Sequence, residues 1–274
     1  MSATVVRMTD QATRIARFRA RHERPEPLLL PNPWEPGTAR LLTGLGFEAL
    51  ATTSLGVANL LGRRRASRQE VLDNLRDICA ATPLPVNADL ENGFADDPTA
   101  AATIIADAYA AGAAGGSIED GDGPRIYEFG LAVDRVRAAV EAARALPAPF
   151  VLTARAESLL YGANDLADTI KRLQAFEEAG ADVLYAPGLR TIEDMRAVVS
   201  SVGKPVNVVM GFADPTITLE QLADAGVRRV SIGAAFSRIA LRAVVDAARE
   251  MQAGRFGFVA DMLPMPELHQ AFPD

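Results

Sequence analysis

One pattern recurs along this chain and limits the folds that it can adopt. An alanine-rich segment with helical periodicity ends at a glycine, and a short apolar segment follows. Copies read AYAAGAAGGSI at residues 108–118, FEEAGADVLY at 176–185, LADAGVRRVSI at 222–232 and LLTGLGFEAL at 41–50. A glycine at this place is the left-handed residue that ends a helix before a parallel strand. The pattern therefore predicts repeated units of helix and parallel strand.

Strand-like and helical segments alternate over most of the chain. We expect strands at Leu28–Leu30, Phe47–Thr53, Val86–Asp89, Ala114–Ile118, Phe150–Arg155, Val183–Ala186, Val206–Val209 and Arg229–Gly233. We expect helices to begin near Pro36, Ser67, Pro98, Leu131, Asn164, Thr191, Thr218 and Ala235. Eight β-then-α units in a chain of 274 residues predict an α/β fold of the (β/α)8 barrel type.

An open, doubly wound parallel sheet is the alternative fold for such an alternation. That fold usually carries a glycine-rich phosphate-binding loop after its first strand. Here the corresponding segment reads LLLPNPWEPGTA (residues 28–39), which contains neither G-x-G-x-x-G nor a P-loop pattern. The barrel is therefore favoured.

The two ends of the chain flank the eight units, and we take the whole chain as a single domain. Residues 1–25 read as an amphipathic N-terminal helix with Ile15 and Phe18 facing inward. Residues 254–274 read as a C-terminal extension that forms a short surface helix or packs on another subunit. The helix Ala235–Met251 has widely spread apolar residues and needs extensive cover, from its own barrel or from a neighbouring subunit.

Composition excludes several classes of partner. The formal net charge is −7 and the isoelectric point is about 5.0, so nucleic acid is not expected, because phosphate binding needs a basic face. The one basic run, GRRRASR at residues 62–68, reads as a solvated loop. The single cysteine, Cys79, allows no internal disulfide, which favours a cytoplasmic protein. We find no apolar signal region and no membrane-spanning stretch, so no membrane partner is expected.

Polar residues gather where the predicted strands end, which is where barrels of this type place their active sites. Side chains alternate along a strand, so Asn87 shares a face with Asp89, Ser117 with Glu119, and Thr153 with Arg155. Burying such groups is costly unless they are paired or bind a ligand. The arc therefore predicts a binding site. The alternative is a purely structural network in which Arg155 pairs with Asp89 or Glu119.

The remaining acid–base candidates are few. His22 and His269 lie near the termini, outside every strand end, and no Ser–His or Cys–His nucleophile is available. Glu91 falls in the loop after the third strand, and Asp96 and Asp97 read as helix-capping residues. Carboxylates with one arginine suit Mg²⁺ or Mn²⁺ and an anionic, oxygen-rich substrate.

Three motifs carry a family resemblance. VNADLENGF (residues 86–94), GGSIED (115–120) and LTARAE (152–157), in this order and spacing, resemble the isocitrate lyase / phosphoenolpyruvate mutase superfamily. The resemblance implies a (β/α)8 barrel, often a tetramer whose last barrel helix is exchanged between subunits, hence a homo-oligomer (dimer or tetramer). It also implies Mg²⁺, a small 2-oxo or dicarboxylic acid, and a C–C or C–P bond made or broken beside it.

The resemblance also implies roles for individual residues. Thr53, Ser54 and Leu55 would hold the oxygens of the substrate through backbone N–H groups and a hydroxyl. Asp89 and Glu119 would lie around the metal, in part through water. Arg155 would grip a substrate carboxylate in bidentate fashion.

Further candidates are weaker. Asn207, on the seventh strand, is a substrate-binding candidate. Tyr185 or Tyr127 could donate a proton, because the cysteine that lyase members carry after the IED motif is absent from GDGPRIYEFG (residues 121–130).

Two departures affect the predicted metal site. Asn87 stands where the family has its direct aspartate ligand, and Arg65 aligns with another aspartate of the metal shell. An amide oxygen can still bind Mg²⁺, but without charge. We therefore expect weakened metal affinity.

The leading hypothesis is a Mg²⁺-assisted lyase-type enzyme acting beside a 2-oxo acid or enolate. Isocitrate-lyase-like C–C cleavage, oxaloacetate decarboxylation or hydrolysis, and phosphonopyruvate-type C–P chemistry all remain open. The alternative is a 2-oxo acid binding protein with a weakened metal site and little catalysis.

Overall fold

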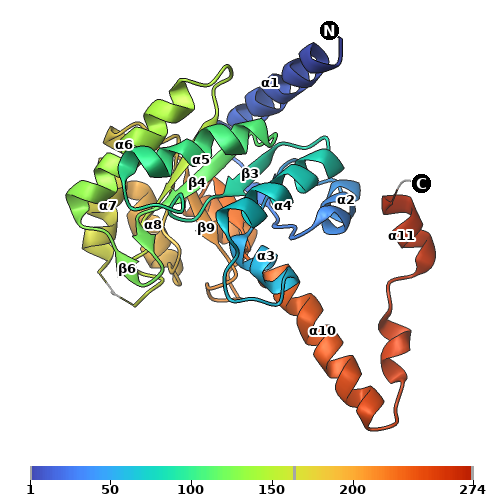
Figure 1. The fold of residues 1–274 in the computed structure, drawn as a ribbon. Coiled ribbons are helices and arrows are strands. Elements are labelled where there is room, and N and C mark those ends of the chain that lie inside the picture. The colour runs from blue at the N-terminus through green and yellow to red at the C-terminus, as the bar shows by residue number, and fades with distance from the viewer. Residues whose placement is uncertain (1, 163–164, 273–274) are drawn as a thin grey trace.

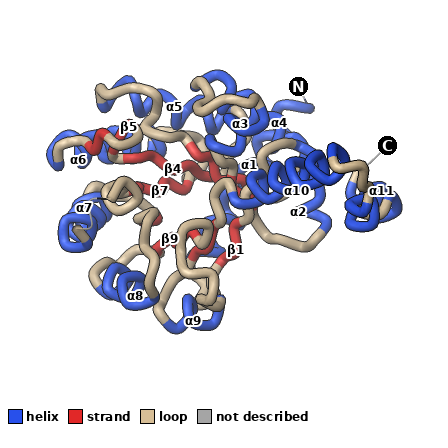
Figure 2. Tube along the Cα trace, turned by 90° about the horizontal axis from the view of Figure 1, so that it is seen from below, coloured by secondary structure: helices blue, strands red, loops and turns tan. Residues whose placement is uncertain are grey.

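Eight parallel strands form a nearly closed barrel with helices around it (Figures 1 and 2). The computed structural model describes residues 2–162 and 165–272, with side chains from residue 11 onward. The strands are β1 (Leu28–Leu30), β2 (Leu50–Ala51), β3 (Val86–Asp89), β4 (Gly115–Glu119), β7 (Val151–Arg155), β8 (Val183–Tyr185), β9 (Val206–Val209) and β10 (Arg229–Ser231). They pair in the order β1-β10-β9-β8-β7-β4-β3-β2. A hydrogen bond from the Ala51 N–H to the Pro31 carbonyl (3.0 Å) joins the two edges. The predicted (β/α)8 barrel is confirmed.

The barrel helices follow the predicted order. They are α2 (Pro36–Gly44), α4 (Arg68–Ala81), α5 (Pro98–Ala110), α6 (Phe129–Arg144), α7 (Leu166–Glu178), α8 (Ile192–Ser200), α9 (Leu219–Asp224) and α10 (Ala235–Gln252). Helix α6 begins at Phe129 rather than at Leu131, and the predicted start at Asn164 lies outside the described residues. The four glycines of the repeated pattern all have positive φ, between 84° and 104°, as a left-handed helix end requires.

The bounds of four predicted strands, β4, β7, β8 and β10, shift by one or two residues. Strand β2 covers only Leu50–Ala51 instead of the predicted Phe47–Thr53, and the chain turns after it into an unpredicted helix, α3 (Ser54–Leu60). Thr53 is the N-cap of α3, and its side chain accepts the Gly56 N–H. After β4 the chain forms a short hairpin, β5 (Gly121–Asp122) with β6 (Arg125–Ile126).

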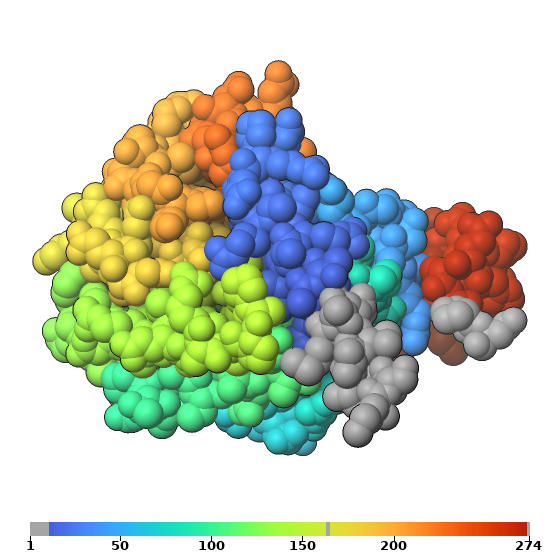
Figure 3. All heavy atoms as spheres, turned by 90° about the horizontal axis from the view of Figure 1, so that it is seen from above, coloured from blue at the N-terminus to red at the C-terminus, as the bar shows by residue number. Residues whose placement is uncertain are grey.

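Helix α1 (Ser2–His22) closes the end of the barrel where the strands begin. Its Ile15 and Phe18 are fully buried, as predicted, and pack with Leu28, Val151 and Val183, the first residues of β1, β7 and β8. Figure 3 shows this N-terminal segment lying across that face. An apolar cluster therefore fills the end of the barrel where the strands begin.

The C-terminal part of the chain leaves the barrel. Helix α10 extends away from it, and a short 3-10 helix η1 (Gly257–Asp261) and helix α11 (Met265–Ala271) return toward α2 (Figure 1). Large apolar side chains along this arm are exposed: Ile239, Leu241, Val244, Val245, Met251, Phe256, Val259, Met262, Leu263 and Met265. This extended arm matches the prediction that the last barrel helix needs further cover.

Over residues 2–162 and 165–272, we find no helix that combines the length and the apolar character needed to cross a membrane.

Candidate active site

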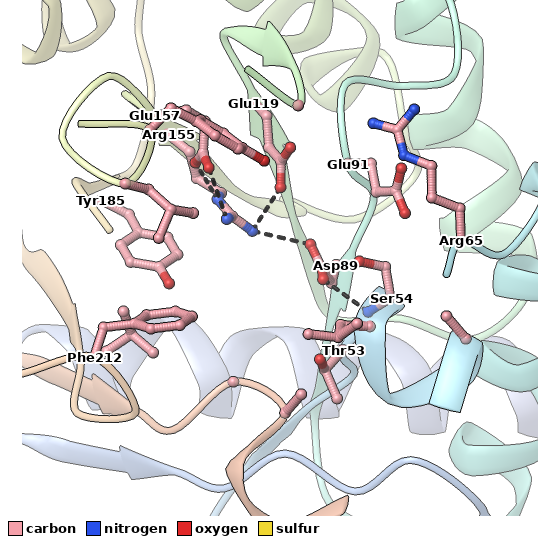
Figure 4. A pocket seen from close by; sticks show the side chains of 18 of the residues that line it. Thr53, Ser54, Arg65, Asp89, Glu91, Glu119, Arg155, Glu157, Tyr185 and Phe212 are labelled. Carbon is pink, nitrogen blue, oxygen red and sulfur yellow. Dashed lines mark hydrogen bonds and ion pairs between the residues drawn. The ribbon is translucent and has the colours of Figure 1, made fainter. Parts of the chain in front are cut away.

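A pocket of about 250 Å³ opens where the barrel strands end (Figure 4). We call it the mouth pocket. It is lined by residues from the strand ends and the loops beyond them: Thr53, Ser54, Leu55, Ala58, Arg64, Arg65, Asp89, Glu91, Glu119, Gly123, Arg155, Glu157, Leu160, Tyr161, Tyr185, Val209, Phe212, Gly233 and Ala234. The pocket combines several carboxylates with three arginines, which suits a small anionic or metal-chelating ligand.

Arg155 is the centre of the pocket's charged groups. Its Nη1 lies 3.0 Å from Asp89 Oδ1 and 3.0 Å from Glu119 Oε1. Its Nε and Nη2 donate to the two oxygens of Glu157, at 2.8 and 3.3 Å. The register of β4 and β7 sets Glu119 directly beside Arg155. The fork of Nε and Nη2 therefore holds a carboxylate of the protein itself, and the predicted structural pairing forms with both Asp89 and Glu119.

Burial raises the pKa of the Glu119 carboxyl well above its usual value, against the opposing effect of Arg155. Burial likewise raises the pKa of Glu157. The same burial disfavours the charge on Arg155, but its carboxylate neighbours outweigh it and raise the guanidinium pKa. Three carboxyl groups around one guanidinium therefore form a cluster that can keep a proton on a carboxyl group.

Asp89 is held by the start of α3. Its Oδ2 accepts the Ser54 N–H (2.8 Å), and its own N–H donates to Thr52 Oγ1 (2.9 Å). The predicted oxygen-binding residues Thr53, Ser54 and Leu55 all line the mouth pocket. One of the predicted N–H donors, that of Ser54, is thus already used to orient a carboxylate.

Glu91 lies in the loop after β3, as predicted, and this loop places it on the wall of the mouth pocket. Its backbone adopts a left-handed conformation (φ 46°), and its carbonyl accepts the Glu119 N–H at 2.9 Å. Burial first, and then the Asp89 charge, raise the pKa of Glu91 to about 7, while Arg65 opposes the shift. Alternation continued beyond β3 would have put Glu91 on the same face as Asp89, a signal that the loop assignment hid.

Arg65 lies at the rim and brings a positive charge to the mouth pocket, as its alignment suggested. Its Nη2 donates to Asp122 Oδ1 of the β5–β6 hairpin at 2.9 Å. Tyr161 and Phe212 line other parts of the rim. The sequence analysis did not identify Asp122, Tyr161 or Phe212 as site residues.

Two predicted site residues lie deeper than the mouth pocket. Asn87 and Asn207 line a second cavity of about 50 Å³ inside the barrel, which we call the inner cavity. Its lining is largely polar: Leu30, Asn32, Ala51, Thr52, Thr53, Asn87, Asp89, Ser117, Arg155, Tyr185, Asn207, Arg229, Ser231 and Gly233. The Asn87 Oδ1 is buried and has no hydrogen-bond partner among the described residues.

The two tyrosine candidates are separated by the fold. Tyr185 is buried, lines both cavities and has the Arg155 guanidinium 4.7 Å from its ring centre. Burial raises the pKa of its hydroxyl. Tyr127 lies outside the mouth pocket, where its hydroxyl donates to Asp96 Oδ1 (2.7 Å) and accepts from Asn92 (2.8 Å). Asp97 caps α5 as predicted, whereas Asp96 pairs with Arg125 and Tyr127 instead.

The fit of a divalent cation can be judged from the donors. Asp89, Glu91 and Glu119 bring hard carboxylate oxygens to the mouth pocket. Across the described part of the chain, however, no three Asp, Glu, His or Cys residues are arranged as a ready metal cage. The mouth pocket therefore offers hard oxygen donors for a divalent cation, but the described residues do not form a complete set of direct ligands.

The fold and the pocket together define a class: a (β/α)8 barrel with an acidic, arginine-centred site where its strands end. The chain belongs to the phosphoenolpyruvate mutase family, within the isocitrate lyase / phosphoenolpyruvate mutase superfamily. The family model described as phosphoenolpyruvate phosphomutase matches residues 18–252.

Known relatives agree with this assignment. A crystal structure described as a "putative lyase/mutase" from Burkholderia cenocepacia J2315 is 50% identical, covers 97% of this chain and 98% of that chain, and has a TM-score of 0.94. The 2-methylisocitrate lyase of Escherichia coli K12 is 30% identical over 77% of this chain and 75% of its own length. A structure of oxaloacetate acetylhydrolase with its product oxalate is 26% identical, with a TM-score of 0.84 and coverage of 95% and 94%.

Proposed function

We propose that this chain is a lyase-type enzyme that cleaves a C–C or C–P bond beside a 2-oxo acid or enolate in the mouth pocket. The observation that carries the proposal is the cluster of Asp89, Glu119 and Glu157 around Arg155 at the strand ends. Negative charge develops on an enolate oxygen as such a bond breaks. Cations and N–H donors fixed near that oxygen stabilise the transition state more than the ground state.

Each residue has a definite part in this proposal. Arg155 supplies positive charge beside the substrate and orients Asp89 and Glu119. Thr53, Ser54 and Leu55 bind substrate oxygens at the start of α3, and Tyr185 closes the pocket floor beneath Arg155. Asn207 acts on the substrate only if part of it reaches the inner cavity.

The cofactor that we propose is Mg²⁺ or Mn²⁺. Asp89 and Glu119 would hold it, in part through water, with Glu91 beside them; Asn87 stays a predicted neutral ligand. When bound, the cation supplies Lewis-acid stabilisation of the enolate charge. The absence of a carboxylate at Asn87 and the presence of Arg65 predict weaker affinity than a fully acidic shell would give.

The test is a product screen with the full chain. Oxaloacetate, 2-methylisocitrate and phosphonopyruvate are incubated with the protein and Mg²⁺ or Mn²⁺, and ¹H and ³¹P NMR follow the products against a protein-free blank. We expect turnover of at least one acid, a loss on the order of 10²-fold in Arg155→Gln, and full activity in Arg137→Gln, which changes an exposed arginine of α6.

The alternative function, an acid-binding protein with little catalysis, is favoured by Arg65 at the rim and by the use of the Arg155 fork for Glu157. It predicts that calorimetry detects binding of oxalate or a 2-oxo acid without metal, while no acid is turned over. That pair of results would contradict the enzyme proposal.

We further propose that the chain forms a homo-oligomer, a dimer or tetramer, in which α10 packs on a second copy. Ile239 and Val244 of α10 are 63% and 64% exposed, and the arm beyond α10 is similarly apolar. Light scattering after gel filtration should show a dimer or tetramer for the wild type and a smaller species for Val244→Glu. Arg137→Glu serves as the exposed control, and a monomeric wild type at micromolar concentration would contradict the proposal.

A further inference from the structure

Arg229 is a buried cation that no carboxylate balances among the residues that the structure describes. It lies on β10, only 2% exposed, and makes two hydrogen bonds to neutral groups: Nε to Asn207 Oδ1 (2.8 Å) and Nη1 to Thr153 Oγ1 (3.0 Å). Among the described residues it forms no ion pair within 4.0 Å. Burial, helped by the charge of Arg155, lowers its pKa to about 9, and Tyr185 only partly opposes this. The protein thus holds a positive charge that its surroundings disfavour.

The inner cavity beside Arg229 has room for a small ligand. Its volume is about 50 Å³, more than one water molecule needs. Asp89 is the carboxylate in its lining, and its charge is paired with Arg155 at 3.0 Å, not with Arg229. The lining therefore offers Arg229 no unengaged counter-charge.

The hydrogen bonds around Arg229 direct a second donor into the cavity. A guanidinium only donates, so the Asn207 oxygen has to accept from Arg229. The Asn207 Nδ2 then donates to Ser231 Oγ at 3.1 Å. The Ser231 hydroxyl accepts this bond, which leaves its own hydrogen free to donate. Arg229 and Ser231 both line the cavity and present donors to it, while the unpartnered Asn87 Oδ1 in the same lining is an acceptor.

We propose that the inner cavity binds one small monovalent anion, held by the Arg229 guanidinium and the Ser231 hydroxyl. Water would satisfy the hydrogen bonds but would leave the charge unbalanced, whereas an anion satisfies both. Chloride is small enough, and so is a carboxylate group.

The anion has two possible sources. Five residues line both cavities, namely Thr53, Asp89, Arg155, Tyr185 and Gly233, so the inner cavity adjoins the floor of the mouth pocket. The anion is therefore either a free halide or the carboxylate end of an acid bound in the mouth pocket. The first goes beyond the proposed function, and the second rests on it.

The first experiment is crystallographic. Crystals of the full chain are grown without halide and soaked in sodium bromide, and data are collected at the bromine absorption edge. We expect an anomalous peak in the inner cavity within hydrogen-bond distance of Arg229 and Ser231. Soaks with oxalate then show whether a carboxylate displaces the bromide or whether the two bind side by side, which separates the two sources.

The second experiment measures binding in solution, so that an ion present at crystal concentration only is recognised. The melting temperature is followed in chloride against gluconate at constant ionic strength. Chloride at ten times its Kd should raise the melting temperature by roughly 3 °C or more. Arg229→Gln should lose this response, and Arg228→Gln, which changes the arginine just before β10, should keep it.

A third variant covers the case in which Arg229→Gln does not fold. Ser231→Ala keeps the Arg229 cation and should weaken chloride binding several-fold. An unchanged chloride concentration at the midpoint of the melting-temperature response would contradict the proposed geometry. Water alone in the wild-type cavity after both soaks, or bromide in the crystal without any chloride effect on melting, would overturn the proposal. These measurements need no substrate, so their failure is distinct from failure of the proposed enzyme activity.

Discussion

Two arginines lie inside the same barrel and are treated in opposite ways. Arg155, at the end of β7, lies within 3.0 Å of three carboxylates. Arg229, at the start of β10, hydrogen-bonds within the described part of the chain only to Asn207 and Thr153. Both are almost completely buried, at 9% and 2% exposure. The pKa of Arg155 is raised and that of Arg229 is lowered to about 9. The neighbouring groups, and not the degree of burial, therefore decide whether the pKa of each arginine is raised or lowered.

The contrast between Arg155 and Arg229 indicates what each region can bind. The mouth pocket has more acidic groups than cations around Arg155, so it suits a cation or a proton together with the substrate. The inner cavity has a cation with no counter-charge, so it suits an anion. The two regions share a wall at Asp89, Arg155 and Tyr185, which couples their electrostatics.

The largest effect that we expect is a difference in the free energy of unfolding between variants of Arg155 and Arg229. Arg155→Met leaves three buried carboxyl groups without their cation, and such a loss costs on the order of 3–5 kcal/mol in free energy of unfolding. Arg229→Met removes an unbalanced cation and should change that free energy by about 1 kcal/mol or less, in either direction. Urea unfolding in chloride-free buffer measures both. Equal losses in the two variants would refute the contrast drawn between them.

A second prediction concerns His22 of α1, whose pKa is lowered in part by the charge of Arg229. His22 is buried, with its Nδ1 2.8 Å from the Phe18 carbonyl. Burial first, and then Arg229, lower its pKa from 6.5 to about 3, with Arg19 adding to the effect and Asp182 opposing it. The pKa of His22 is lower in the folded state than in the unfolded state. The part of the free energy of unfolding that depends on neutral His22 is therefore fully present above pH 6.5 and is lost as the pH falls from 6.5 toward 3.

The expected contribution of His22 at pH 5 is a loss of about 2 kcal/mol relative to pH 7. His22→Gln should remove this part of the acid sensitivity, while His269→Gln, at an exposed position, should not. NMR titration should also show a higher His22 pKa in Arg229→Met than in the wild type. If Arg155→Met produces the same rise, the field at His22 does not come specifically from Arg229.

Much of this arrangement was predictable from the sequence. Alternation along β3, β4 and β7 correctly put Asp89, Glu119 and Arg155 at one end of the barrel. Alternation gives the face of a residue but not its depth. Asn87 is two residues before Asp89 and therefore about 6.6 Å deeper along the strand, in the inner cavity.

What the sequence could not give depends on backbone geometry and on partners distant in the chain. Alternation could put Glu91 on the face of Asp89, but the left-handed backbone (φ 46°) that Glu91 adopts in this loop cannot be predicted from its residue type. Glu157 looked like the residue after a strand, and its role follows from the way that Arg155 folds back onto it. The inner cavity depends on β9 and β10 meeting β1 as the barrel closes, and no local pattern encodes that closure.

The smallest expected effect concerns Asn87 and tests the border between the two regions. Asn87→Asp adds a carboxylate to the lining of the inner cavity, which Arg229 shares. We expect this carboxylate to act as the counter-charge of Arg229, so that the chloride effect on melting temperature disappears. Mg²⁺ affinity, measured by calorimetry, should then rise by only a few-fold.

The opposite outcome is equally informative, because the superfamily resemblance predicts it. If Asn87 is a weakened metal ligand, the added charge should tighten Mg²⁺ binding tenfold or more and leave the chloride effect in place. Asn87→Leu, which offers neither charge nor a ligand oxygen, is the matched control for both measurements. A tenfold gain in Mg²⁺ affinity would extend the cation site of the mouth pocket down to Asn87, and the anion would then be confined to the side of the inner cavity next to Ser231.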